Sequence, residues 1–246
     1  VSGRRPPYPL YMTSWQRRWE LIKSNDLGQT WTSLAPQLVS GISAESRSGG
    51  LYRDSGVPIL HVHGLAIDPN DDNTVYVGSV HDAVNPVDFT LEGVHIFKST
   101  DGGKTFTESS QGIPTETQTA VGFIVVDPAD SNLVYAALTR HESVVALGIY
   151  KSADAGTTWA PANSGLLDLD VRHMVLDPLN RGTIYAATGG GVFKSTDAGA
   201  QWQSAAAGIT STNVYTLVMS PTNPNILYAA TTDGVFKTKN GGSSWY

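Results

Sequence analysis

The chain has 246 residues, of which 15% are charged, and its formal net charge is −6. Binding to nucleic acid needs a basic patch, and the few lysines and arginines here are scattered, so we expect no nucleic-acid partner. The lack of cysteine excludes disulfides and thiolate metal sites, and no run approaches the roughly 18 apolar residues that a membrane span needs. Because the chain opens at Val1 with no signal-like segment, we expect a processed, trimmed or partial chain.

An octet of the form Ser/Thr-x-Asp/Asn-x-Gly-x-x-Trp/Phe occurs five times along the chain. The octets begin at Ser24, Ser99, Ser152, Ser195 and Thr238, and their third residues are Asp26, Asp101, Asp154, Asp197 and Asn240. Successive third residues are 75, 53, 43 and 43 positions apart. A unit of 43 residues matches the roughly 40–50 residues of one propeller blade, and the longer spacings indicate insertions.

Four of the units share the same strand pattern before the octet. A run that is apolar on both faces leads into a turn at Asp68-Pro69, Asp127-Pro128, Asp177-Pro178 and Ser220-Pro221. A second strand carries Tyr76, Tyr135, Tyr185 or Tyr228, a third leads into the octet, and a fourth starts at the octet's aromatic residue. Strands that are apolar on both faces are typical of sheets packed between other sheets.

This pattern predicts an all-β fold, a β-propeller of four-stranded antiparallel blades, in one domain over residues 1–246. The expected blades are about 8–35, 60–110, 119–163, 169–206 and 212–246, with an insertion at 36–59. The first unit lacks a recognisable innermost strand. Either the chain is part of a larger ring with further blades, or a divergent N-terminal segment supplies that strand.

The composition of the octet explains why it recurs. Glycine takes positive φ at no steric cost in a hairpin turn, and the Asp carboxylate and the Ser or Thr hydroxyl accept backbone N–H groups. A catalytic or metal site is normally singular, whereas a fold-forming turn is repeated. We therefore assign the octets a structural role and predict no metal and no cofactor.

The motifs together resemble the BNR/Asp-box repeat proteins. The resemblance is carried by the Asp-Pro pairs, the segments LYAAT at 227–231 and GVFKSTDAG from Gly191, and the octets themselves. With these motifs the chain is similar to sortilin-type propellers, photosystem II assembly-factor-like proteins, xyloglucan-active glycosidases and sialidases. For a sialidase the resemblance implies three arginines that clamp a carboxylate. None of the nine arginines lies at a repeated blade position, so we expect no sialidase activity.

Blade geometry separates the loops onto two faces. The strand 1–2 turns and the octets share one face, and the insertions at 36–58, 80–92 and 139–147 belong to the other, which we expect to be the functional face. The candidate binding residues begin the innermost strands or lie in and beside these insertions: His61, His63, His81, Arg140, His141, Arg172, His173 and Tyr215. His61 and His63, at strand spacing, could ligate a metal with His81, but solvated rim and loop residues are the favoured interpretation.

Two functions remain open from the sequence. The first is a non-catalytic binding or scaffolding propeller, exported from a bacterial cell, that engages a protein or glycan through this face. The alternative is a glycoside hydrolase, which needs two carboxylates about 5–5.5 Å or about 6.5–9.5 Å apart. The available carboxylates are Asp82, Asp88, Glu142, Asp168 and Asp170, and no pair among them is singled out.

Overall fold

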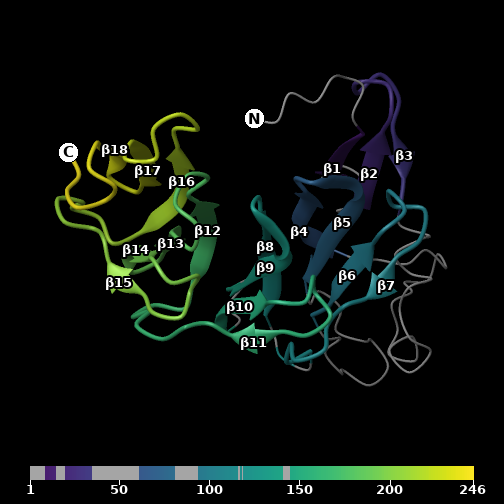
Figure 1. Cartoon of the computed structure of the whole chain (residues 1–246), viewed down its shortest axis with the longest axis horizontal. Coiled ribbons are helices and arrows are strands. Elements are labelled where there is room, and N and C mark those ends of the chain that lie inside the picture. The colour runs from purple at the N-terminus through teal and green to yellow at the C-terminus, as the bar shows by residue number, and fades with distance from the viewer. Residues whose placement is uncertain are drawn as a thin grey trace.

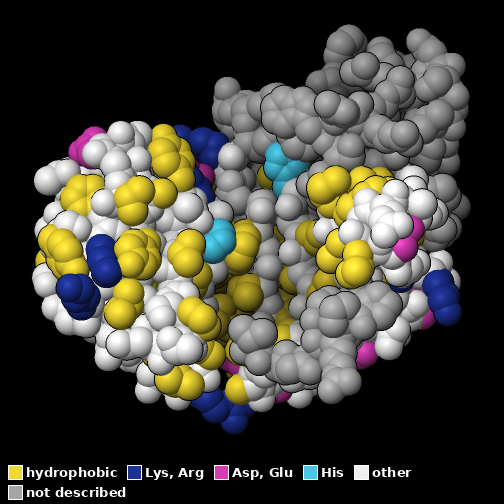
Figure 2. Space-filling view, turned by 90° about the horizontal axis from the view of Figure 1, so that it is seen from above, with side chains coloured by type: hydrophobic (Ala, Val, Ile, Leu, Met, Phe, Trp, Pro, Cys, Tyr) yellow, Lys and Arg dark blue, Asp and Glu magenta, His cyan; other side chains and the backbone are white. Residues whose placement is uncertain are grey.

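The computed structural model describes residues 9–14, 20–34, 61–80, 94–115, 117, 119–140 and 145–246. Every regular element in these ranges is a β-strand, and the sheets follow one another along an open arc (Figure 1). The first and last sheets stand on the two sides of the opening, with a hollow between them (Figure 2). The described ranges contain no helix long and apolar enough to cross a membrane. The predicted all-β propeller is confirmed.

The strands form five antiparallel units in chain order. The first unit is β1 (Leu10–Ser14), β2 (Glu20–Ser24) and β3 (Thr32–Ser33). The second is β4 (His61–Asp68), β5 (Asp71–Val80), β6 (Ile96–Ser99) and β7 (Thr107–Glu108), and the third is β8 (Ala120–Asp127), β9 (Asp130–Thr139), β10 (Gly148–Ser152) and β11 (Ala160–Pro161). The fourth is β12 (Val171–Leu176), β13 (Ile184–Thr188), β14 (Gly191–Ser195) and β15 (Gln203–Ser204), and the fifth is β16 (Val214–Met219), β17 (Leu227–Thr231) and β18 (Gly234–Thr238).

Among the described residues, the units at the two ends of the arc have three strands each. In the first unit, β1 pairs with β2 from Leu10↔Ser24 onward, so β1 occupies the place of a second blade strand. In the fifth unit, Lys237 and Tyr246 exchange two backbone hydrogen bonds of 2.9 and 3.0 Å, which begin a fourth strand. The hydrophobic core lies between neighbouring blades. One buried cluster joins Tyr76 of the second blade to Val121 and Trp159 of the third.

Each octet forms a tight turn held by its own side chains. In the third blade, Ser152 Oγ donates to Asp154 Oδ1 at 2.7 Å and accepts the Gly156 N–H at 2.8 Å. Asp154 also accepts the backbone N–H of Thr158 at 2.8 Å and its hydroxyl at 2.6 Å. These hydrogen bonds lower the pKa of Asp154 to about 2, because they favour the charged carboxylate.

A β-bulge lies near the start of each innermost strand, directly after its first valine. The pairing shifts between Val62 and Gly64, between Val121 and Phe123, between Val171 and His173, and between Val214 and Thr216. The residues inserted at these bulges are His63, Gly122, Arg172 and Tyr215. A bulge re-aims the inserted side chain and breaks the alternation of the strand. The hypothesis that His61 and His63 could ligate a metal at strand spacing assumed that alternation.

Candidate functional site

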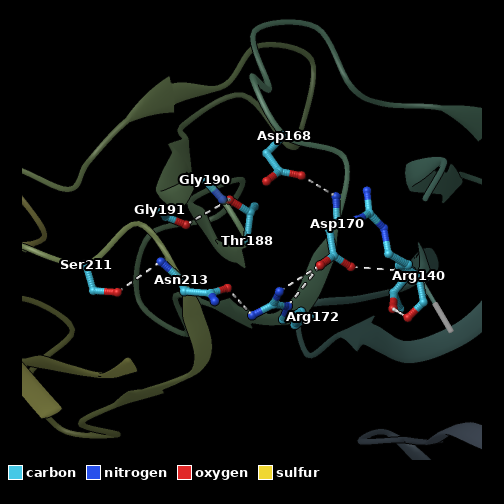
Figure 3. A network of polar contacts seen from close by, with 10 residues as sticks. Arg140, Asp168, Asp170, Arg172, Thr188, Gly190, Gly191, Ser211 and Asn213 are labelled. Carbon is cyan, nitrogen blue, oxygen red and sulfur yellow. Dashed lines mark hydrogen bonds and ion pairs between the residues drawn. The ribbon is translucent and has the colours of Figure 1, made fainter. Parts of the chain in front are cut away.

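A network of polar side chains lies at the end of the fourth and fifth blades that is opposite their octets (Figure 3). Asp168 and Asp170 lie in the loop before β12, and Arg172 occupies the bulge of that strand. Asn213 directly precedes β16, and Tyr215 occupies the bulge of β16. The octet of the fourth blade instead bonds to the far end of the sheet, where the Ala198 N–H donates to the Gly182 carbonyl at 2.9 Å. We call Asp168, Asp170, Arg172, Asn213 and Tyr215 the rim site.

Arg172 is the centre of the rim site. Its Nε and Nη2 donate to Asp170 Oδ2 at 3.1 and 2.8 Å, and its Nη1 donates to Asn213 Oδ1 at 2.7 Å. The guanidinium carbon lies 5.1 Å from the centroid of the Tyr215 ring, which is within the range of a cation–π contact. Arg172 therefore joins the fourth blade to the fifth and orients an aromatic ring that is 49% exposed.

Asp170 is nearly enclosed by its partners. Its side chain is buried, one oxygen accepts from the Arg172 guanidinium, and the other accepts the backbone N–H of Arg140 at 3.3 Å. The backbone of Asp170 is also held, because its N–H donates to Asp168 Oδ1 at 2.8 Å and its carbonyl accepts the Gly189 N–H at 3.2 Å. The fixed position of Asp170 in turn fixes Arg172.

The second oxygen of Asp168 faces a small space above Gly189. A Cβ at Gly189 would lie 2.8 Å from Asp168 Oδ2, 3.5 Å from Asp170 Oδ2 and 3.5 Å from Arg172 Nη2. The missing side chain of Gly189 therefore keeps open the place where two carboxylates and a guanidinium converge. A polar ligand group placed there could accept from Arg172 and donate to Asp168.

His173 follows Arg172 and packs inside the arc. Its ring lies 4.5 Å from the Phe123 ring, centroid to centroid, and its Nδ1 is buried without a hydrogen-bond partner in the described part of the chain. Burial lowers the pKa of His173 below its ordinary value of 6.5, because the charged ring would lose water contacts. The His173 ring therefore packs in the interface between the third and fourth blades.

Several predicted site residues lie outside the described residues. These are His81, Asp82, Asp88, His141 and Glu142, together with the insertion at 36–59 and the side chain of His61. Of the predicted residues that are described, Asp168, Asp170, Arg172 and Tyr215 come together in the rim site, and Arg140 contributes its backbone N–H. No group of three His, Asp or Glu residues that could hold a metal ion occurs among the described residues.

Sequence reasoning did not single out Asn213 or Gly189. The sequence does contain a signal for Gly189. The fourth unit has the glycine pair Gly189-Gly190 after its second strand, where the fifth unit has two residues with side chains, Thr232 and Asp233. Asn213 carried no such signal. Asn213 enters the site only because β16 packs beside β12, which brings the Asn213 amide oxygen to Arg172.

The fold and the rim site define the chain as a β-propeller with a polar site at one mouth of the arc. A family model described as the DUF6242 beta propeller domain matches residues 134–246, which is less than half of the chain. A xyloglucanase from Hypocrea jecorina (strain QM6a) is 26% identical over 175 residues, which cover 61% of this chain and 17% of that protein.

Solved structures show the same fold. An ancestral GH74 enzyme has a TM-score of 0.66 at 20% identity, over 97% of this chain and 29% of that one. The extracellular domain of a one component system from B. thetaiotaomicron has a TM-score of 0.59 at 11% identity, over 94% of this chain and 26% of that one. The chain thus spans less than a third of the length of each of these proteins. It is a β-propeller similar to those of glycoside hydrolases.

Proposed function

We propose that this chain is a non-catalytic binding propeller of the Asp-box type, which engages a glycan through the rim site. The observation that carries the proposal is the Arg172–Tyr215 contact, which fixes an exposed aromatic ring beside hydrogen-bonding groups. Sugars are bound by such combinations, because their C–H faces pack on aromatic rings while their hydroxyls pair with carboxylates, amides and guanidinium groups. The similarity to a xyloglucanase supports a glycan over other ligands.

The hydrogen bonds of Asp170 favour binding over hydrolysis. A glycosidase acid or nucleophile must approach the scissile bond with a carboxyl oxygen that is free to hold a proton or to attack carbon. Both oxygens of Asp170 already accept hydrogen bonds, from Arg172 and from the Arg140 backbone. Asp168 Oδ2 is better placed than either oxygen of Asp170 to accept a hydrogen bond from a ligand hydroxyl. A single carboxylate of this kind can bind a sugar, whereas hydrolysis needs two carboxyl groups.

Isothermal titration with xyloglucan oligosaccharides and a wider panel of plant and bacterial glycans tests the proposal. We expect binding by the unaltered chain and a loss of at least about tenfold in Tyr215→Ala, which corresponds to about 1.4 kcal/mol. Tyr246→Ala is the matched control, because Tyr246 is 63% exposed but follows the last octet. No binding to any glycan, or equal loss in both variants, contradicts the proposal. Binding of a protein partner instead would assign the rim site to protein recognition.

A glycoside hydrolase is the second candidate. It is favoured by the two carboxylates that converge above Gly189 and by the similarity to a xyloglucanase. Release of reducing ends from xyloglucan by the unaltered chain, abolished in Asp168→Asn, would establish this activity and reject the non-catalytic function. Asp82, Asp88 and Glu142 remain proposed carboxylates for the same test.

We also propose that the protein is exported and bacterial. The lack of cysteine is compatible with an oxidising compartment, and one of the similar propellers is an extracellular domain. Fractionation of the native host, with the protein followed by antibody, tests this proposal. Recovery in the cytoplasmic fraction alone would contradict it.

A further inference from the structure

Neighbouring blades are joined by the same pair of hydrogen bonds at all four junctions of the arc. A tyrosine hydroxyl from the second strand of one blade and a lysine Nζ from its third strand both donate to one backbone carbonyl. That carbonyl belongs to the fourth residue of the next blade's octet. The donor pairs and acceptors are Tyr11 and Lys23 with Gly102, Tyr76 and Lys98 with Ala155, Tyr135 and Lys151 with Ala198, and Tyr185 and Lys194 with Gly241, at 2.5–3.2 Å.

The fifth blade carries the same pair, Tyr228 and Lys237, and no described residue of another blade offers it an acceptor. Lys237 Nζ lies 5.0 Å from the centroid of the Tyr228 ring, as Lys194 Nζ does from Tyr185. Tyr185 is 2% exposed under the next octet, whereas Tyr228 is 40% exposed. The hydrogen bond with Tyr228 raises the pKa of Lys237 above its ordinary value, so the Lys237 ammonium is present as a donor at neutral pH.

The apolar surface around this pair is also uncovered. Val235 is 70% exposed, while Val192, the residue 43 positions earlier, is fully buried against the fifth blade. Val218 on the innermost strand is 60% exposed. On the side of the arc where the chain ends, Figure 2 shows exposed hydrophobic side chains with basic side chains among them. The equivalent positions of the preceding blade pack against the next blade. Exposed apolar surface at such positions indicates an interface.

We infer that this face of the fifth blade, formed by Val218, Tyr228, Val235 and Lys237, is the docking site for one further propeller blade. The blade that fits it presents an octet turn whose fourth residue is small and offers its carbonyl to Tyr228 and Lys237. The proposal rests on the continuity of the interface: the same donors, at the same positions, bind the same acceptor four times within the chain.

The first blade of this chain does not meet that requirement. The fourth residue of each bound octet is Gly or Ala, and a Cβ at Gly241 would already lie 3.3 Å from Tyr185 Oη and 3.6 Å from Lys194 Nζ. The first octet has Leu27 at this place, 58% exposed, and no described residue donates to its carbonyl. A leucine is larger than a Cβ by three carbons, so the occupant is a different blade and not the first blade of this chain or of a second copy.

An extended chain tests the inference directly. Because Tyr246 stands 43 positions after Gln203, a second copy of residues 204–246 can be appended after Tyr246 in register. We expect the extended chain to unfold at a higher temperature than the 246-residue chain, by at least about 4 °C. In the extended chain the double substitution Tyr228→Phe and Lys237→Ala removes this gain. In the 246-residue chain the same double substitution leaves the midpoint within about 1 °C, since Tyr228 is exposed and Lys237 is only half-buried there.

A matched control variant places leucine at the fourth residue of the appended octet, as at position 27. We expect this variant to lose the gain as well. An unchanged midpoint on extension, or a gain that survives the double substitution, overturns the inference. Sedimentation velocity of the 246-residue chain tests whether a second copy occupies the face. Concentration-dependent association that Lys237→Ala abolishes would identify a second copy as the occupant, and this result would also overturn the inference.

Discussion

The hydroxyl of Tyr185 donates a 2.9 Å hydrogen bond to the carbonyl of Gly241, and this contact crosses the junction between the fourth and fifth blades. Tyr185 is almost completely buried at that junction, while Tyr228, its counterpart one blade later, is 40% exposed. Within their own blades the two tyrosines have equivalent strand partners, a valine and a lysine, and they differ in whether another blade covers them. They are therefore a matched pair for measuring what a junction contributes.

Tyr185→Phe is expected to lower the free energy of unfolding by about 1 kcal/mol, because a buried hydrogen bond is lost while Lys194 still donates to the same carbonyl. Tyr228→Phe is expected to change it by less than about 0.5 kcal/mol. Urea titrations followed by tryptophan fluorescence give both values. Equal effects in the two variants would show that the hydroxyl acts within its own blade.

Asp154→Asn is expected to preserve the octet turn, since Asn240 makes the same bonds in the last octet, accepting from Thr238 Oγ1 at 2.8 Å and from the Ser244 N–H at 2.9 Å. The folded-state pKa of Asp154 is lowered to about 2 from 3.8. Its contribution to stability is therefore full above the unfolded value of 3.8 and is lost as the pH falls through about 2.

The thermal midpoint measured from pH 5 to pH 2 tests this. We expect the midpoint of the variant to fall less steeply with pH than that of the unaltered chain, with similar values at pH 7. Asp130→Asn serves as the control, because Asp130 begins β9 outside any octet, where it accepts amide bonds from Asn132 and lies 3.8 Å from Arg181 in an exposed ion pair. An identical acid limb in Asp154→Asn and in the unaltered chain would contradict the assignment.

Arg172→Ala removes the guanidinium that pairs with the buried Asp170 and with Asn213. We expect a loss of about 1–3 kcal/mol in unfolding free energy, because the Asp170 carboxylate would be left without its main donors. Arg181→Ala, which breaks an ion pair of 3.8 Å whose arginine is 67% exposed, should cost less than about 0.5 kcal/mol. Urea titrations compare the two, and a larger loss in Arg181→Ala would refute the central place of Arg172.

Gly189→Ala tests the shape of the rim site without removing any polar group. The added Cβ would lie 2.8 Å from Asp168 Oδ2, so this carboxylate must move. We expect a loss of glycan affinity of at least about tenfold in titration calorimetry, about 1.4 kcal/mol, with the fold retained by circular dichroism. Ala200→Gly, an exposed change in the octet of the same blade, is the control. Full affinity in Gly189→Ala would place the ligand elsewhere.

His173→Phe is expected to change how stability depends on pH between 7 and 5. Burial lowers the folded-state pKa of His173 below 6.5, so the native state resists protonation and loses stability as the pH falls below 6.5. Phenylalanine keeps the ring contact with Phe123 and has no proton to gain. Midpoints of urea unfolding at pH 7 and pH 5 should differ less in the variant; an unaltered difference would show that His173 does not titrate in this range.

The strand order and the turns could be predicted from the sequence because they depend on residues close together in the chain. An octet such as Ser152–Trp159 closes its turn with its own Ser, Asp and Gly, and the 43-residue period repeats the same local solution. These interactions involve separations of two to four residues, so a pattern of residue types is enough to recognise them.

The rim site and the blade junctions were decided by tertiary structure. The bulges that insert Arg172 and Tyr215 leave no distinct mark on residue type, and they break the alternation on which strand reasoning depends. The bond from Arg172 to Asn213 spans 41 positions and the bond from Tyr185 to Gly241 spans 56, and both exist only because one blade packs on the next. The sequence by itself determined the blade and its turn, since each is made by near neighbours. Packing between blades decided which polar groups meet and which face stays uncovered.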